Sequence, residues 1–152
     1  MYCVCDSVLA VPSTNHGRPC EDSEWRIPWS KVEPVLNEGT SPHTVYHYRN
    51  AAGEPLSTTL TIQAERIDAG HTTEVSQEQC SFMYHCYAGD GQTIVTPPNG
   101  EATVFSWTSR DTFAVPAWSK IQHVNNSGSR AYLVAVSDRP LLDLLRLRRP
   151  PA

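Results

Sequence analysis

Short segments in which apolar and polar residues alternate recur along most of the chain. The clearest are residues 43–48, 57–67, 79–87, 92–96, 102–107, 112–115, 122–125 and 131–137. Alternation with a period of two residues is typical of β-strands that bury one face. Gly, Pro, Asn and Asp residues separate these segments, so the pattern predicts an all-β fold, an antiparallel barrel or jelly roll.

Two short helices are expected at the ends of this strand-rich region. Ser30 is a candidate cap for a helix over residues 31–36, although Pro34 lies within that segment. Residues 140–147 (PLLDLLRL) form an amphipathic pattern, with Pro140 suited to the first turn of a helix. Residues 1–24 lack periodicity and predict an N-terminal arm, which leaves residues 25–152 as one domain.

Composition narrows the classes of partner. The chain has 152 residues and a formal net charge of -4, without the basic cluster that a nucleic-acid partner would require. Its five cysteines are an odd number, which favours reduced thiols and a cytoplasmic protein over a disulfide framework. The N-terminus has no basic residue before its brief apolar run, and no segment has the length of a membrane span.

Several short motifs carry a family resemblance. They are residues 88–91 (AGDG), 115–118 (VPAW), 123–125 (HVN) and 137–140 (SDRP). In these motifs the chain resembles the cupin superfamily, and in particular the C-terminal cupin domain of gentisate 1,2-dioxygenases. The resemblance implies a single-domain cupin, a double-stranded β-helix or jelly-roll barrel, that corresponds to half of a two-cupin enzyme.

The resemblance also implies where a metal would bind. Cupin dioxygenases hold iron through a His-x-His pair in the first strand block and a third His in the second. These positions are occupied here by Ser76, Glu78 and Ile121, and Phe82 stands where some cupins add a glutamate. Because a non-haem Fe(II) site usually needs three protein ligands, this departure predicts a barrel without a metal.

Strand parity identifies the side chains that point into the barrel. If Glu78 points inward, alternate residues as far as Cys86 share its face, and His123 follows Ile121 on the inward face of the second block. The expected catalytic residues are Glu78, His123 and Tyr84. The expected substrate-binding residues are Gln63, Glu65, Phe82, Cys86, Trp107, Trp118 and Ile121.

A carboxylate, an imidazole and a phenol in an apolar cavity can support general acid–base catalysis. We therefore expect a cofactor-free, metal-independent enzyme, an isomerase, dehydratase, cyclase or other lyase. Its substrate would be a small hydrophobic or aromatic molecule of specialised-metabolite biosynthesis. One alternative is a gentisate-type ring-cleaving dioxygenase, in which Fe(II) is held by Glu78 and His123 together with His71 or Cys86. Another is a ligand-binding cupin subunit without catalysis.

Each of these side chains also has a purely structural alternative. Glu78 could pair with Arg66 or Lys120, and His123 could bond only to a neighbouring strand. Exposed strand edges and the aromatic residues near Trp25 favour pairing between chains, so we expect a homodimer.

Overall fold

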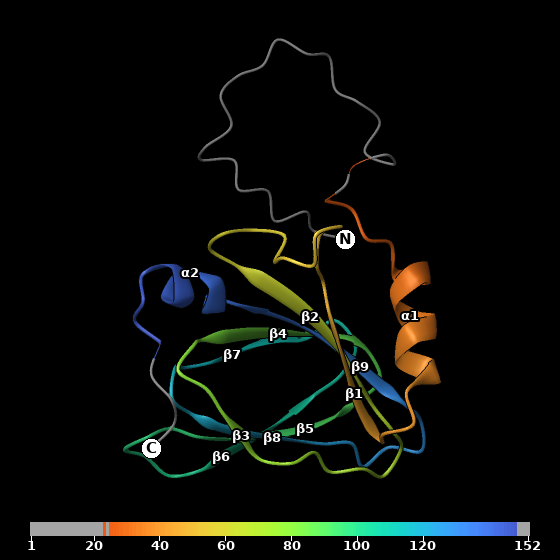
Figure 1. Ribbon diagram of the computed structural model, residues 1–152. Coiled ribbons are helices and arrows are strands. Elements are labelled where there is room, and N and C mark those ends of the chain that lie inside the picture. The colour runs from red at the N-terminus through yellow and green to blue at the C-terminus, as the bar shows by residue number, and fades with distance from the viewer. Residues whose placement is uncertain (1–22, 24, 149–152) are drawn as a thin grey trace.

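The structure is a computed structural model that describes Ser23 and residues 25–148; the arm expected over residues 1–24 lies outside the described residues except for Ser23. Within this part of the chain, antiparallel strands form two sheets (Figure 1). The five-stranded sheet has the order β1 (His43–His47), β2 (Thr61–Ile67), β9 (Ala131–Ser137), β4 (Phe82–Ala88) and β7 (Thr112–Val115). The four-stranded sheet has the order β3 (Ser76–Gln77), β8 (Lys120–Val124), β5 (Gly91–Thr96) and β6 (Thr103–Trp107).

The two sheets face each other and confirm the all-β jelly roll expected from the sequence. Every predicted strand is present, with shifts at the ends. β2 begins at Thr61 because residues 51–59 form turns and bends, and the two-residue strand β3 was not predicted. In β4, Phe82, Tyr84 and Cys86 are buried while the residues between them are exposed, which confirms the predicted parity.

Helix α1 (Trp29–Glu38) lies beside β1 and β9 (Figure 1). Val32 and Leu36 are fully buried and pack against Ala64 of β2. The helix begins earlier than predicted, and its N-cap is Pro28 without a side-chain cap, so the capping role expected of Ser30 is wrong. Helix α2 (Arg139–Leu144) follows β9 and is shorter than predicted.

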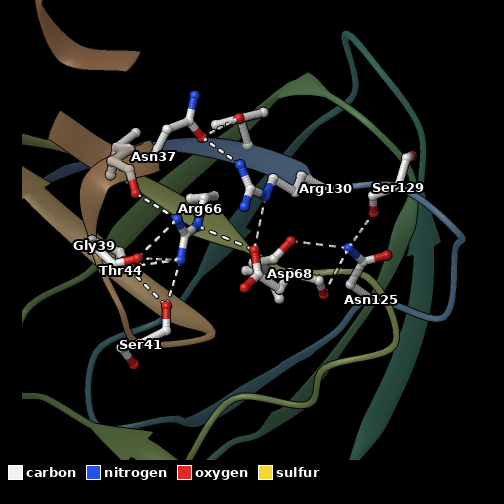
Figure 2. Close-up of polar contacts among 12 residues, drawn as sticks. Asn37, Gly39, Ser41, Thr44, Arg66, Asp68, Asn125, Ser129 and Arg130 are labelled. Carbon is white, nitrogen blue, oxygen red and sulfur yellow. Dashed lines mark hydrogen bonds and ion pairs between the residues drawn. The ribbon is translucent and has the colours of Figure 1, made fainter. Parts of the chain in front are cut away.

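A buried arginine fastens the end of α1 to the sheet (Figure 2). Arg66 of β2 donates a 2.7 Å hydrogen bond to the carbonyl of Leu36 and a further bond to the carbonyl of Ser41. Its Nε lies 3.3 Å from the Asp68 carboxylate, which Arg130 also contacts at 3.1 Å. A buried guanidinium is tolerated only when its charge and donors are paired, so these contacts fix the loop between α1 and β1.

The described residues include two helices, and neither combines the length and the apolar composition needed to cross a bilayer.

Candidate functional site

A cavity of about 380 Å³ lies inside the barrel. This volume is within the range of small-molecule sites. Its lining includes His43 of β1, Gln63 and Glu65 of β2, Phe82 and Tyr84 of β4, Ile121 and His123 of β8, Arg139 of α2, and Glu78 and Ser119 from connecting segments. The structure thus brings the three expected catalytic residues, Glu78, Tyr84 and His123, to one cavity.

Glu65 is a buried carboxylate on the inward face of β2. It accepts a 2.8 Å hydrogen bond from Gln63 Nε2 through one oxygen, and its other oxygen lies 2.9 Å from His43 Nε2. Burial by itself would raise the pKa of Glu65, but the hydrogen bonds and the nearby imidazoles of His43 and His123 lower it below its ordinary value. Glu65 is therefore a charged acceptor whose oxygens already have partners. The placement of Gln63 and Glu65 also establishes which face of β2 lines the cavity.

His123 is 3% exposed and has one free ring nitrogen. Its Nδ1 lies 2.8 Å from Thr93 Oγ1, and the same hydroxyl accepts a 2.8 Å hydrogen bond from Trp107 Nε1. Its Nε2 is buried without a partner. Burial lowers the pKa of His123 to about 4, so the ring is neutral near pH 7. An unpaired buried donor or acceptor costs about 1–3 kcal/mol, which a bound ligand can recover.

Aromatic rings form one wall of the cavity. The Tyr84 ring stacks on Phe82 with centroids 5.7 Å apart and meets the His123 ring edge-on at 4.8 Å. Burial, together with the charge of Glu65, raises the pKa of Tyr84 well above its ordinary value, so its hydroxyl keeps its proton. These rings offer a flat apolar surface on which an aromatic ligand can pack.

Glu78 and Arg139 form an ion pair in the cavity lining, and both side chains are partly exposed. Arg139 Nη2 donates to both carboxylate oxygens of Glu78, and the side chains are 25% and 33% exposed. Burial would lower the pKa of Arg139, but the Glu78 carboxylate outweighs it and raises that pKa. Burial and Glu78 also raise the pKa of the Cys80 thiol to about 11, so this thiol is no nucleophile at neutral pH.

The partner of Glu78 is therefore neither Arg66 nor Lys120. Arg139 was missed because the SDRP motif was interpreted only as a family marker. A side chain at the start of α2 reaches Glu78 across 61 residues of sequence, and neither strand parity nor local spacing predicts such a contact.

Unpaired hydrogen-bonding groups gather around this cavity. Among the described residues, buried side-chain nitrogens and oxygens that form no hydrogen bond occur at Arg66 Nε, which keeps its ion pair with Asp68, and at Ser119 Oγ, His123 Nε2, Ser137 Oγ and Arg139 Nε. Three of the five belong to residues that line the cavity, namely Ser119, His123 and Arg139. Buried polar groups normally have partners, so these three groups are candidates for contact with a polar ligand. Since the serine hydroxyl and the guanidinium nitrogen can donate, acceptor oxygens would satisfy them.

Three of the expected substrate-binding residues lie outside the cavity lining. Cys86 directs its thiol to the Gly89 carbonyl, 3.4 Å away, next to a register shift in β4. Trp107 is buried behind Thr93. Trp118 has a backbone φ of 64° and donates its N–H to the Glu78 carbonyl, so it shapes the loop that carries Ser119. Gln63, Glu65, Phe82 and Ile121 do line the cavity.

The donor set does not fit an iron centre with three protein ligands. Ser76 is exposed, Glu78 is held by Arg139, and Ile121 is apolar, so the three positions implied by the family resemblance offer one engaged carboxylate. Over residues 25–148, no group of three His, Cys, Asp or Glu side chains is placed to hold a metal ion. His71 and Cys86, the other ligands considered, do not line the cavity.

Comparisons with known proteins agree with the fold. The chain is 29% identical over 136 residues to 5-aminosalicylate 1,2-dioxygenase from a Comamonas species, a match that covers 84% of this chain and 35% of that protein. The chain thus spans about a third of the length of this curated relative. No established family profile matches it.

Solved structures give the same result. Salicylate 1,2-dioxygenase from Pseudaminobacter salicylatoxidans superposes with a TM-score of 0.70 at 24% identity, over 81% of this chain and 37% of that one. An oxalate decarboxylase superposes with a TM-score of 0.60 at 15% identity, over 66% of this chain and 27% of that one. The predicted cupin fold and the resemblance to gentisate-type dioxygenases are confirmed.

Two expectations from the sequence are wrong. The metal-independent isomerase, dehydratase, cyclase or lyase is contradicted because the relative found by sequence and the solved structure with a TM-score of 0.70 are both 1,2-dioxygenases of aromatic acids. The expected absence of a cofactor is contradicted because dioxygenases of this type depend on Fe(II). Both errors have one origin: the loss of the ligand positions was interpreted as a change of reaction, whereas the rest of the domain retains its similarity to dioxygenases.

Proposed function

We propose that this cupin-fold chain, with its similarity to aminosalicylate and salicylate dioxygenases, acts in the oxidative ring cleavage of an aromatic acid. Its own share in that reaction is to bind and orient the acid in the barrel cavity. The observation that carries the proposal is the set of unpartnered groups at Ser119, His123 and Arg139 beside an aromatic wall.

The chemistry of an aromatic acid such as salicylate complements this cavity. The carboxylate suits Arg139, whose Nε remains free although its Nη2 is bound to Glu78. A ring hydroxyl or carboxylate oxygen suits Ser119 and His123, and the ring itself can pack on Phe82 and Tyr84. Binding would displace water from the cavity and fix the plane of the ring. Because the described residues do not form an iron site, no step through iron is assigned to this domain.

Oxygen uptake tests this function. The purified chain would be supplied with Fe(II) and with salicylate, 5-aminosalicylate or gentisate, while dissolved oxygen and the ultraviolet absorbance of the ring are followed together. The result expected of a chain that takes part in ring cleavage is oxygen uptake that depends on one of these acids, with an equal loss of the aromatic absorbance; it would place the iron ligands outside the three positions occupied by Ser76, Glu78 and Ile121. Uptake that is the same with and without every acid would contradict the proposal.

A binding cupin without catalysis is the second candidate. It is favoured by the side chains that replace the expected iron ligands, Ser76, Glu78 and Ile121. Saturable binding of an aromatic acid, combined with no oxygen uptake after Fe(II) is added, would support this candidate over the first.

The edges of the two sheets bear on whether the chain forms a dimer. Among the described residues, β1 and β7 are the edges of one sheet and β3 and β6 those of the other, and such edge strands support the homodimer that we propose. Light scattering at micromolar concentration tests the dimer, and a measured mass equal to that of one chain would contradict it.

The free thiols of Cys80 and Cys86 support a reducing compartment, and we propose the cytoplasm.

A further inference from the structure

Thr93 of β5 links three elements behind the cavity. Its hydroxyl oxygen lies 2.8 Å from Trp107 Nε1 of β6 and 2.8 Å from His123 Nδ1 of β8. All three side chains are at most 3% exposed. Gly91 leaves room for this arrangement, because a Cβ at that position would lie 2.7 Å from the Trp107 ring. The contact is therefore built into the packing of the four-stranded sheet.

The positions of the hydrogen atoms in this cluster can be inferred from which of its atoms can donate and which can accept. An indole nitrogen can only donate, so Trp107 uses one lone pair of the Thr93 oxygen. Among the residues that the structure describes, the acceptor within reach of the Thr93 hydroxyl hydrogen is His123 Nδ1. If the hydroxyl donates there, the neutral imidazole carries its proton on Nε2. The opposite tautomer would leave both the hydroxyl hydrogen and the Nε2 lone pair without partners, which is the less satisfied state.

We propose that Trp107 and Thr93 are positioning residues that lock His123 in the Nε2–H tautomer, so that it donates to an acceptor oxygen of the ligand in the cavity. This inference rests on the proposed function only for the identity of the ligand, an aromatic acid. It assigns a direction to the contact: the ligand atom at His123 is an oxygen that accepts, and a ligand amine in that position is disfavoured.

The same tautomer explains why His123 is unsuited to a metal. A histidine coordinates through an unprotonated ring nitrogen, and its other nitrogen then donates a hydrogen bond. Here Nδ1 would have to donate to the second lone pair of the Thr93 oxygen, which would leave the Thr93 hydroxyl hydrogen without the acceptor that it has in the other tautomer. The three-residue cluster therefore favours an organic oxygen over a cation at Nε2.

Ring-nitrogen NMR of the full chain tests the tautomer without any ligand. Long-range proton–nitrogen spectra of protein labelled at histidine nitrogens distinguish a protonated Nε2 from a protonated Nδ1, and loss of signals in His123→Gln assigns the residue. The expected result at pH 7 is a protonated Nε2 in the wild type and in Thr93→Ser, which keeps the hydroxyl. Thr93→Val removes the hydroxyl, so both tautomers should appear. A protonated Nδ1 in the wild type would overturn the inference.

Salicylate binding tests the contact itself. Addition of salicylate should shift the Nε2–H signal, and Thr93→Val should weaken salicylate binding roughly tenfold, with recovery in Thr93→Ser. Unchanged affinity in Thr93→Val would overturn the role assigned to the cluster. If Nε2 is protonated but salicylate does not bind, the tautomer assignment is supported and the proposed function is contradicted.

Discussion

In the cavity, the buried carboxylate has its hydrogen-bond partners, whereas two buried side-chain nitrogens lack one. Glu65 is bound by Gln63 and His43, whereas His123 and Arg139 each keep one buried nitrogen free. A ligand rich in acceptor oxygens satisfies the free donors without competing for the occupied acceptors. The polarity of the site therefore favours an acid over an amine.

Arg139 provides a direct test at the scale of one residue. Arg139→Gln removes the guanidinium that we expect to receive the carboxylate, so salicylate binding should weaken roughly 10- to 100-fold, the worth of a hydrogen bond to a charged group. Titration calorimetry measures the change. Arg148→Gln, an exposed arginine 3.4 Å from Asp143, is the matched control and should bind as the wild type does. Equal losses in both variants would indicate a general charge effect.

The buried imidazole of His123 predicts how stability depends on pH. Its pKa is about 4 in the folded chain, against an ordinary value of 6.5, because burial disfavours the charged form. The unfolded chain therefore takes up a proton below about pH 6.5 that the folded chain takes up only near pH 4. The free energy of unfolding should fall as pH drops through this window, by on the order of 3 kcal/mol. Burial also lowers the pKa of His47, which adds to the same trend.

Urea denaturation at several pH values checks this expectation. His123→Gln should remove most of the decrease between neutral pH and pH 4.5, whereas His85→Gln, on the exposed face of β4, controls for the loss of a histidine. An unchanged pH dependence in His123→Gln would show that the imidazole is not the group responsible.

At the scale of elements, strand positions and their inward faces were predictable, but contacts between distant segments were not. Alternation in residues 79–87 was enough to place Phe82 and Tyr84 inside the barrel, since period-two patterns report which face is buried. It could not reveal the pairing of Glu78 with Arg139, because the start of α2 reaches the cavity only through the tertiary fold. Trp107 was expected to line the cavity, but it lies behind Thr93. Strand parity predicts the face on which a side chain lies, but not whether another side chain separates it from the cavity.

The attachment of α1 to the sheet gives a prediction at this scale. Arg66→Met keeps a long buried side chain but leaves the carbonyls of Leu36 and Ser41 without their donor and removes one cation from Asp68. The free energy of unfolding should fall by about 2–5 kcal/mol, because two carbonyls that accept from a charged donor are left without it. Urea denaturation measures this loss. Arg130→Met, at the exposed side of the same carboxylate, should cost much less.

At the scale of the whole molecule, the described residues form a barrel with the cupin fold, and the chain matches only 35% of the length of its curated relative. The fold is similar to that of a salicylate dioxygenase, and the described residues form no group of three side chains that could hold a metal ion. Both candidate functions, ring cleavage and binding without catalysis, depend on one claim. The barrel cavity of this chain must receive an aromatic acid.

Calorimetric titration of the full chain with salicylate, in the wild type and in Ile121→Trp, tests this claim most directly. Ile121 lines the cavity, so a tryptophan there would fill the space that the ring needs while leaving Arg139 and His123 in place. We predict one binding site per chain in the wild type and none in a folded Ile121→Trp variant. No binding to the wild type, or equal affinity in both proteins, would contradict the account.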